Sequence, residues 1–269
     1  MLKNFGTLFS ETWKEYKLKL KLFLKIYFTF SILIPLLLLV VFGGLAGIAY
    51  YSDLIFLTYI FAILGILAII AVFTVGSVAL IYASLFAKDS KIRLGKVRED
   101  SIKFFWRYLG LMIFMILIVL FLAILAVGSW SLIILSYWTL LFSIPFTIAL
   151  IVLFIGLAIY WTFSCYILLD ENTKVFLSLR KSFHLVKGKW WRTFGFIILV
   201  GLIVLGVYII IGILQLLFTP LMLLGTNGLI FYNVISLIFR VIASAFITPL
   251  SILFAKNLYL DMKKNKKKN

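Results

Sequence analysis

Long apolar intervals without a charged residue alternate with short basic segments along the whole chain. Residues 26–52 and 54–87 contain no Asp, Glu, Lys or Arg, and each interval is longer than the roughly 20 residues that one transmembrane helix needs. Residues 108–169 are uncharged as well, and residues 193–255 contain a single charged residue, Arg240. Each of these two longer intervals has room for two helices and a turn. The pattern therefore predicts six transmembrane helices.

Turn-forming residues lie near the middle of both longer intervals. Residues 128–136 begin with Gly-Ser, and Trp130, Tyr137 and Trp138 supply aromatic side chains of the kind found at membrane interfaces. Residues 220–228 begin with Pro and end with Gly-Thr-Asn-Gly. We expect the chain to reverse direction at both places.

The distribution of Lys and Arg predicts the orientation of the helices. Every basic residue except Arg240 lies in one of four segments, residues 1–25, 88–107, 174–192 and 256–269. In a six-span chain these segments lie on one side of the membrane, and the three opposite turns contain no Lys or Arg. The positive-inside rule then places both termini in the cytoplasm. We expect the protein to lie in the inner (plasma) membrane.

Each of the first three basic segments also has apolar residues at helical spacings of three and four. An apolar stripe with Trp and Phe, backed by Lys and Arg, is typical of a helix in the headgroup plane. We therefore expect three basic amphipathic interfacial helices, with Asn172 and Thr173 as candidate N-caps of the third. The stripes are Phe5, Leu8, Phe9, Thr12, Trp13, Tyr16 and Leu20; then Leu94, Val97, Ser101, Phe104 and Tyr108; then Phe176, Leu179, Phe183, Val186 and Trp190.

One short motif suggests that a unit of surface helix plus helical hairpin occurs three times. Residues 105–110 (FWRYLG) and 190–195 (WWRTFG) both read aromatic-Trp-Arg-x-x-Gly, whereas residues 21–25 keep only the position and the charge. The repeats would span 1–87, 88–170 and 171–262 of a single domain, 1–262, followed by a basic tail, 263–269. Any six-span protein with both termini inside would show the same alternation, so both interpretations stay open.

The third basic segment also resembles a known group of proteins. Its pattern is Leu168-Leu169-Asp170, then Ser178-Leu179-Arg180-Lys181-Ser182-Phe183, then Trp190-Trp191-Arg192 and Gly195. This is similar to uncharacterised bacterial six-span membrane proteins, a group that includes the membrane domain attached to some glycerophosphoryl diester phosphodiesterases. The resemblance implies a topology and no activity. The attached phosphodiesterase barrel, with its His and acidic site, has no counterpart here.

Composition agrees with an all-α polytopic membrane protein. Hydrophobic residues make up 65% of the chain, charged residues 13%, and the mean hydropathy is +1.20. A soluble domain is only about half apolar.

Arg240 is the most conspicuous polar residue within a predicted span. An Arg at the centre of a transmembrane helix costs about 2.5–3.5 kcal/mol on insertion scales, so we expect it to face the bundle or a wet cavity. Gln215 and Asn233 are candidate partners. Arg240 could serve an anion or headgroup site; alternatively, it could be a structural residue that bonds backbone carbonyls.

Recognisable catalytic and metal-binding motifs are missing from the sequence. His184 is the only histidine and has no neighbours at ligand spacing, and Cys165 has no disulfide partner. The acidic pairs 99–100 and 170–171 lie beside basic residues, which favours helix starts and salt bridges over catalysis. We expect no enzymatic activity, no metal and no cofactor.

The net charge of +17 requires a partner of opposite sign. Anionic lipid headgroups fit better than nucleic acid, because the charge lies directly beside the spans. The predicted function is a non-enzymatic membrane bundle that contacts anionic lipid, with a partner protein or a homo-oligomer as further candidates. The alternative is a transporter or channel for a small anion or lipid that uses Arg240. The expected headgroup or interfacial residues are Trp106, Arg107, Arg180, Lys181, Lys187, Lys189, Trp190, Trp191 and Arg192.

Overall fold

The structure is a computed structural model that describes residues 2–87, 92, 94–131 and 139–266. This described part is helical and contains no strand. Six of its helical stretches are long and apolar enough to cross a membrane by length and composition, which confirms the number predicted from the charge-free intervals. Helices suit a bilayer because they satisfy their own backbone hydrogen bonds. The chain is consistent with a multi-pass integral membrane protein.

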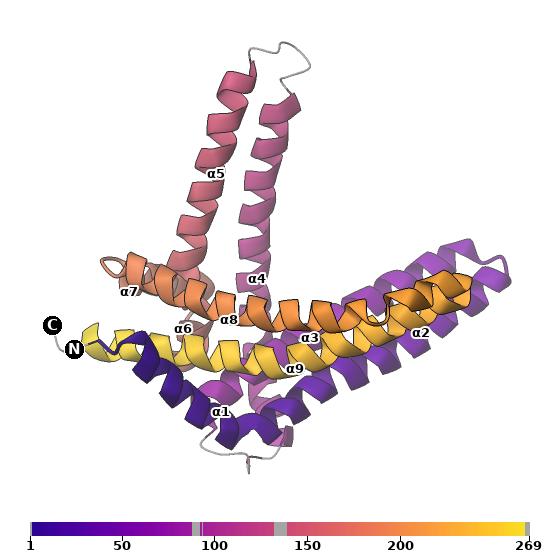
Figure 1. Ribbon diagram of the computed structural model, residues 1–269, viewed down its shortest axis with the longest axis horizontal. Coiled ribbons are helices and arrows are strands. Elements are labelled where there is room, and N and C mark those ends of the chain that lie inside the picture. Colours follow the sequence, from indigo (N-terminus) through magenta and orange to yellow (C-terminus); the bar gives the residue numbers. More distant parts are fainter. Residues whose placement is uncertain (1, 88–91, 93, 132–138, 267–269) are drawn as a thin grey trace. The chain divides into compact units, whose positions relative to one another are not determined.

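The elements follow one another along the chain as drawn in Figure 1. They are α1 (Phe5–Tyr27), η1 (Phe28–Leu33), α2 (Ile34–Tyr51), α3 (Ile55–Phe86), α4 (Leu94–Ser131), α5 (Leu140–Trp161), α6 (Ser164–Asp170), α7 (Val175–Val186), α8 (Trp190–Leu216), η4 (Thr219–Leu224) and α9 (Gly225–Lys266). Several residues of the sequence predictions lie outside the described part: Lys88, Lys91, Arg93, residues 132–138 of the first predicted turn with Tyr137 and Trp138, Lys267 and Lys268.

The chain divides into two compact units. Unit 1 comprises Met1–Ile102 and Gly195–Asp261, and unit 2 comprises Lys103–Phe194 and Met262–Asn269. Helices α4, α8 and α9 each run from one unit into the other. The expected single domain and its repeat boundaries stay predictions.

In unit 1, α1, η1 and α2 form one uninterrupted helical stretch. The expected surface helix therefore continues directly into the first span. Pro35 explains the π-helical segment η1 that precedes α2. A proline in a helix lacks an N–H and its ring clashes with the carbonyl four residues earlier. A widened turn relieves this clash while the chain stays helical.

Helices α2 and α3 pack side by side in Figure 1, joined by a short turn at Asp53, which has a φ of +56°. Glycines on α3 allow the close approach. A Cβ built on Gly65 would lie 2.8 Å from Cβ of Phe42, and one built on Gly76 would lie 2.7 Å from Cβ of Phe30. Small residues have this role at transmembrane helix contacts because they let two backbones approach.

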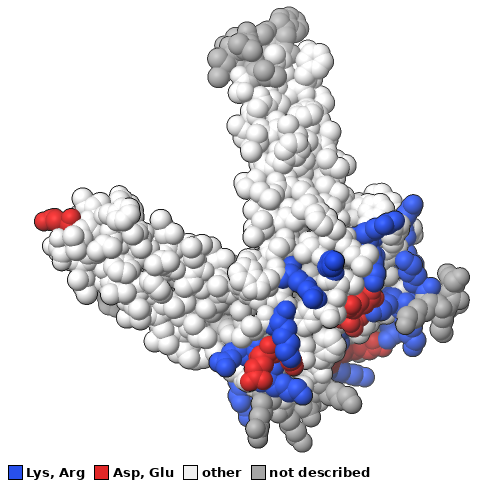
Figure 2. All heavy atoms as spheres, turned by 180° about the vertical axis from the view of Figure 1, so that it is seen from behind, with Lys and Arg blue, Asp and Glu red and all other residues white. Residues whose placement is uncertain are grey.

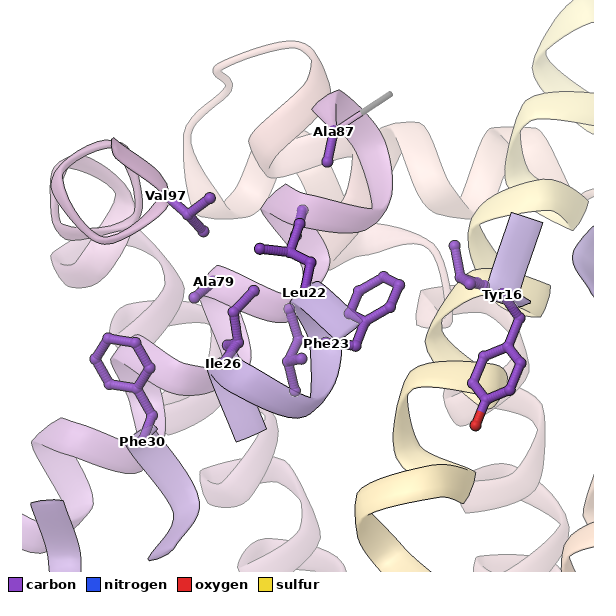
Figure 3. Close-up of a cluster of buried hydrophobic side chains, with 11 residues drawn as sticks. Tyr16, Leu22, Phe23, Ile26, Phe30, Ala79, Ala87 and Val97 are labelled. Carbon is purple, nitrogen blue, oxygen red and sulfur yellow. The ribbon is translucent and has the colours of Figure 1, made fainter. Parts of the chain in front are cut away.

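A hydrophobic cluster lies where α1 and η1 meet α3 and the start of α4. Figure 3 shows Leu22, Phe23 and Ile26 of α1 directed among residues of the neighbouring helices. Phe23 and Ile26 are completely buried. From α3 and α4 the cluster receives small or branched side chains, including Ala79 and Val97. This core anchors the start of the first span to the end of the second.

The apolar stripe predicted for α1 packs largely on the protein itself. Leu8, Thr12 and Tyr16 are buried, whereas Trp13 is 42% exposed. The Tyr16 hydroxyl donates to the Phe246 carbonyl of α9 over 3.1 Å, and Figure 3 shows this ring beside α9. The corresponding stripe of α4 is buried at Val97, Ser101 and Tyr108.

In unit 2, α7 packs on the protein through only part of its apolar stripe. Leu179 and Val186 of the stripe are buried, and Phe176 is 70% exposed. The buried face also includes Ser182, whose hydroxyl donates to the Tyr160 carbonyl over 2.7 Å, near the break between α5 and α6. A small hydroxyl side chain allows close approach and satisfies a carbonyl freed at that break.

The suggested N-caps of α7 are wrong. The N-cap is Lys174, and no side chain caps the helix there. Asn172 has a φ of +49° in the turn after α6, and its side-chain carbonyl accepts a hydrogen bond from Arg107. The side-chain oxygen of Asn172 therefore binds Arg107 and does not cap α7.

The second predicted reversal is displaced toward the N-terminus. Residues 217–224, including η4, make the reversal, and Gly225 to Gly228 form the first turn of α9. Gly225 has a φ of +74°, which glycine adopts readily. A Cβ on Gly228 would lie 1.8 Å from the Leu221 carbonyl oxygen, so the turn requires glycine there.

Large apolar side chains cover the outer surfaces of the spans. Phe56 is 77% exposed on α3, and Phe142 is 79% exposed on α5. Figure 2 shows the visible face of the α4–α5 hairpin without charged atoms above the charged residues at its base. Such continuous apolar surface marks a membrane contact rather than a surface in water.

The Gly76 contact predicts the effect of a single methyl group. Gly76→Ala is expected to lower the free energy of unfolding by about 1–3 kcal/mol, because Phe30 would have to move. Gly44→Ala is the control, since nothing lies within 4 Å of the position that its methyl group would take; it should be neutral or stabilising by about 0.5–1 kcal/mol. Denaturant titration of both variants in detergent micelles measures the difference. Equal stabilities would contradict the close packing of α3 on η1 and α2.

Candidate functional site

A buried ionic cluster joins three helices of unit 1. Glu15 of α1 lies 2.5 Å from Nζ of Lys19 and 2.6 Å from Nζ of Lys256 on α9. The two lysine side chains are only 4% and 6% exposed, and the glutamate side chain is 22% exposed. Lysines are almost never buried to this extent without a partner. One carboxylate thus holds two buried ammonium groups.

Further hydrogen bonds fix the geometry of this cluster. Lys19 donates to the Ser84 carbonyl over 3.1 Å, near the C-terminal end of α3. The last carbonyls of a helix lack partners within the helix and attract cations. Asn257 of α9 donates to Glu15 over 3.2 Å and to the Thr12 hydroxyl over 3.0 Å. The cluster therefore connects α1, α3 and α9 through satisfied polar groups.

Only part of this cluster can be recognised from the sequence. The Glu15–Lys19 pair was recognisable, because residues four apart face each other on a helix and Glu precedes Lys. Lys256 is separated from Glu15 by 241 residues, and no local spacing indicates that contact. In this arrangement one carboxylate stabilises two buried ammonium groups and links α1 to α9.

A second ionic cluster lies in unit 2. Lys263 contacts Asp170 at 2.6 Å and Glu171 at 2.9 Å, and Lys181 contacts Glu171 at 2.6 Å. The predicted salt bridging of this acidic pair is confirmed. In the other acidic pair, Asp100 accepts a hydrogen bond from the Tyr82 hydroxyl over 2.8 Å in unit 1.

The pKa of Glu171 is lower than that of an ordinary glutamate. Partial burial acts in the opposite direction and raises the pKa, but hydrogen bonds and attraction from Lys181 and Lys263 outweigh it. The carboxylate is therefore the preferred form in the folded protein.

Arg240 lies on the exposed surface of α9 rather than toward the interior. Asn233 is exposed as well, whereas Gln215 is buried and donates to the Ser236 carbonyl over 3.3 Å. The structure does not bring these three residues together. Among the described residues, no hydrogen bond or ion pair to Arg240 is found.

The expected headgroup residues are mostly accessible. Exposed side chains are Trp106, Arg107, Arg180, Lys181, Lys187 and Trp191, and half-buried ones are Lys189, Trp190 and Arg192. Trp106 and Trp191, which occupy matching positions of the two motifs, are 78% and 76% exposed. Arg107 also donates to the Asn172 carbonyl over 3.4 Å. The motif copies differ in context, because α4 runs through its copy while α8 begins at Trp190, after a turn with Gly188 at a φ of +80°.

Among the described residues, no group of three or more His, Cys, Asp or Glu could hold a metal ion. His184 is exposed and lies against the Phe183 ring. Cys165 is half-buried, with its thiol 3.9 Å from the Thr162 carbonyl oxygen.

Each unit has an apolar cavity. In unit 2, a cavity of about 300 Å³ lies between α4 and α5, with Tyr108, Met115 and Trp161 in its wall. In unit 1, a wider groove of about 860 Å³ lies between the α1–η1 segment and α9, with Leu24, Phe28 and Phe246 in its wall. Arg240 lines neither of them.

Comparisons with known proteins add no identification. No family model matches this chain, and searches of curated proteins and of solved structures found no match.

Removing the Glu15 charge is expected to destabilise the fold strongly. Glu15→Gln leaves Lys19 and Lys256 buried without a carboxylate and should lower the free energy of unfolding by about 3 kcal/mol. Glu11→Gln on the same helix removes an ion pair to Lys3 whose side chains are 44% and 51% exposed, so it should cost about 0–1 kcal/mol. Denaturant titration compares the two variants. Similar losses would show that the buried cluster is not a principal anchor.

The lowered pKa of Glu171 predicts an acid-sensitive contribution to stability. A pKa that is lower in the folded than in the unfolded state stabilises the protein above the unfolded pKa, and this contribution is lost as the pH falls through the folded pKa. Wild type should therefore be more stable than Glu171→Gln near neutral pH, and the difference should shrink between about pH 5 and pH 2. Thermal unfolding across this range measures it. A difference independent of pH would contradict the ion-pair explanation.

Proposed function

We propose that this protein is a non-enzymatic integral membrane bundle whose basic cytoplasmic side contacts anionic lipid. The observation that supports this most is the separation of charge from apolar surface. The described spans carry large exposed apolar side chains, and all Lys and Arg except Arg240 lie in the segments between or beside them. With the positive-inside rule, this distribution favours cytoplasmic termini in the plasma membrane.

Anionic headgroups suit the basic segments because they lie at the ends of the spans. A basic residue near an anionic membrane surface contributes about 1 kcal/mol. The exposed Arg180, Lys181 and Lys187 of the α7 region, with the exposed Trp191, have the composition of an interfacial anchor. We propose that the basic helices contact headgroups through these charged faces, while most of the apolar stripe of α1 packs on the protein.

The threefold repeat and the resemblance to bacterial six-span membrane proteins are part of this proposal. Similar exposure of Trp106 and Trp191 supports a common role for the two motif copies. The alternative function, transport through Arg240, has less support, because Arg240 is exposed and lies outside the walls of both cavities described above.

Accessibility labelling tests the proposed threading. In a Cys165→Ser background, single cysteines at Ser52, Ser129 and Asn227 should react with a membrane-impermeant maleimide from outside the cell. A cysteine at Ser10, an exposed position of α1, should react only after the membrane is permeabilised and the cytoplasmic side becomes accessible. The first three positions probe the turns that lack Lys and Arg. Ser10 probes the basic N-terminal segment, residues 1–25. Labelling of any of the three from the cytoplasmic side alone would refute the six-span orientation.

A further inference from the structure

The groove between α1–η1 and α9 in unit 1 is lined by two lysines in addition to its apolar wall. Lys21 and Lys25 of α1 take part in the lining together with Leu24, Phe28 and Ile32. Because the surface of the wall is almost wholly apolar, the lysines contribute their methylene stems. Their charged ends then lie at the edge of the groove.

These two lysines differ from Lys19, which precedes them on the same helix. Lys19 is buried and paired with Glu15, whereas Lys21 and Lys25 are exposed. Within the described part of the chain, neither has a carboxylate partner. Residues four apart on a helix lie about 5–6 Å apart at Cβ, so both ammonium groups can approach one phosphate.

The groove also has the right position and size for a lipid chain. Lys25 is the last charged residue before the uncharged interval 26–52, so the groove begins at the end of the first span. From Lys21 to Ile32 the helix rises about 16 Å, which is about half the thickness of a hydrocarbon core. Its volume of about 860 Å³ falls within the range of ligand sites.

We propose that this groove binds one anionic diacyl phospholipid, with the phosphate on Lys21 and Lys25 and an acyl chain along Leu24, Phe28 and Ile32. Basic pockets between transmembrane helices at the cytoplasmic side recognise anionic headgroups in this way. The inference rests on the proposed function, since it assumes that this end of α1 meets the cytoplasmic leaflet. It adds a specific site to a general contact with anionic lipid.

Native mass spectrometry of the full chain in detergent tests the site. The probes are dioleoyl phosphatidylglycerol and dioleoyl phosphatidylcholine, which share their acyl chains and differ in headgroup charge. K21Q/K25Q should weaken the first bound phosphatidylglycerol about thirty-fold, the change expected from losing two basic contacts. It should leave phosphatidylcholine binding unchanged. A245F, which fills the groove beside Ala245, should weaken the binding of both lipids.

K14Q/K17Q is the matched control, because it removes two exposed lysines of α1 that do not line the groove. It should reduce phosphatidylglycerol binding by less than about three-fold, because a screened surface charge contributes little. Equal losses in the two double variants would overturn the groove site and leave the general contact with anionic lipid intact. Equal binding of both lipids by the wild type would overturn the site together with the proposed function.

Discussion

The half-buried carboxylate of Glu15 is the ionic contact that ties the helices of unit 1 together. It lies between two lysines that are almost completely inaccessible, and a buried charge without a partner is strongly destabilising. Through it, the first helix, the end of α3 and the last helix are connected. The Lys3 backbone N–H, which donates to Asp261 over 3.3 Å, reinforces the same pairing of α1 with α9. Segments from the two ends of the chain therefore form one structural element.

Helix packing in the two units relies on different small residues. In unit 1, Gly65 and Gly76 let α3 approach α2 and η1 closely. In unit 2, Ser182 brings α7 against α5 by bonding a carbonyl at the end of that helix. Apolar attraction alone does not drive helices together in lipid, so close packing and polar contacts contribute most of the specificity. The ionic clusters of both units serve the same purpose.

Periodicity located the apolar stripes of the basic helices but not the surfaces that these stripes contact. Leu8, Thr12 and Tyr16 of the α1 stripe are buried on the protein. On α7, Phe176 of the stripe is exposed and a face with serines is buried. In a soluble protein, an apolar side chain on the surface is exposed to water, which is unfavourable. In a membrane protein, the same side chain can contact lipid at no such cost. Hydrophobicity then distinguishes inside from outside poorly, and fit and hydrogen bonding decide instead.

The sequence by itself determined the six spans, because each is a charge-free interval long enough to cross a bilayer and a helix satisfies its own backbone. It also determined where basic residues lie relative to the spans. Only the tertiary structure decided that Lys256 pairs with Glu15, that Arg240 is exposed, and that Lys21 and Lys25 border an apolar groove. These outcomes depend on contacts between residues far apart in the chain, and local spacing carries no information about them.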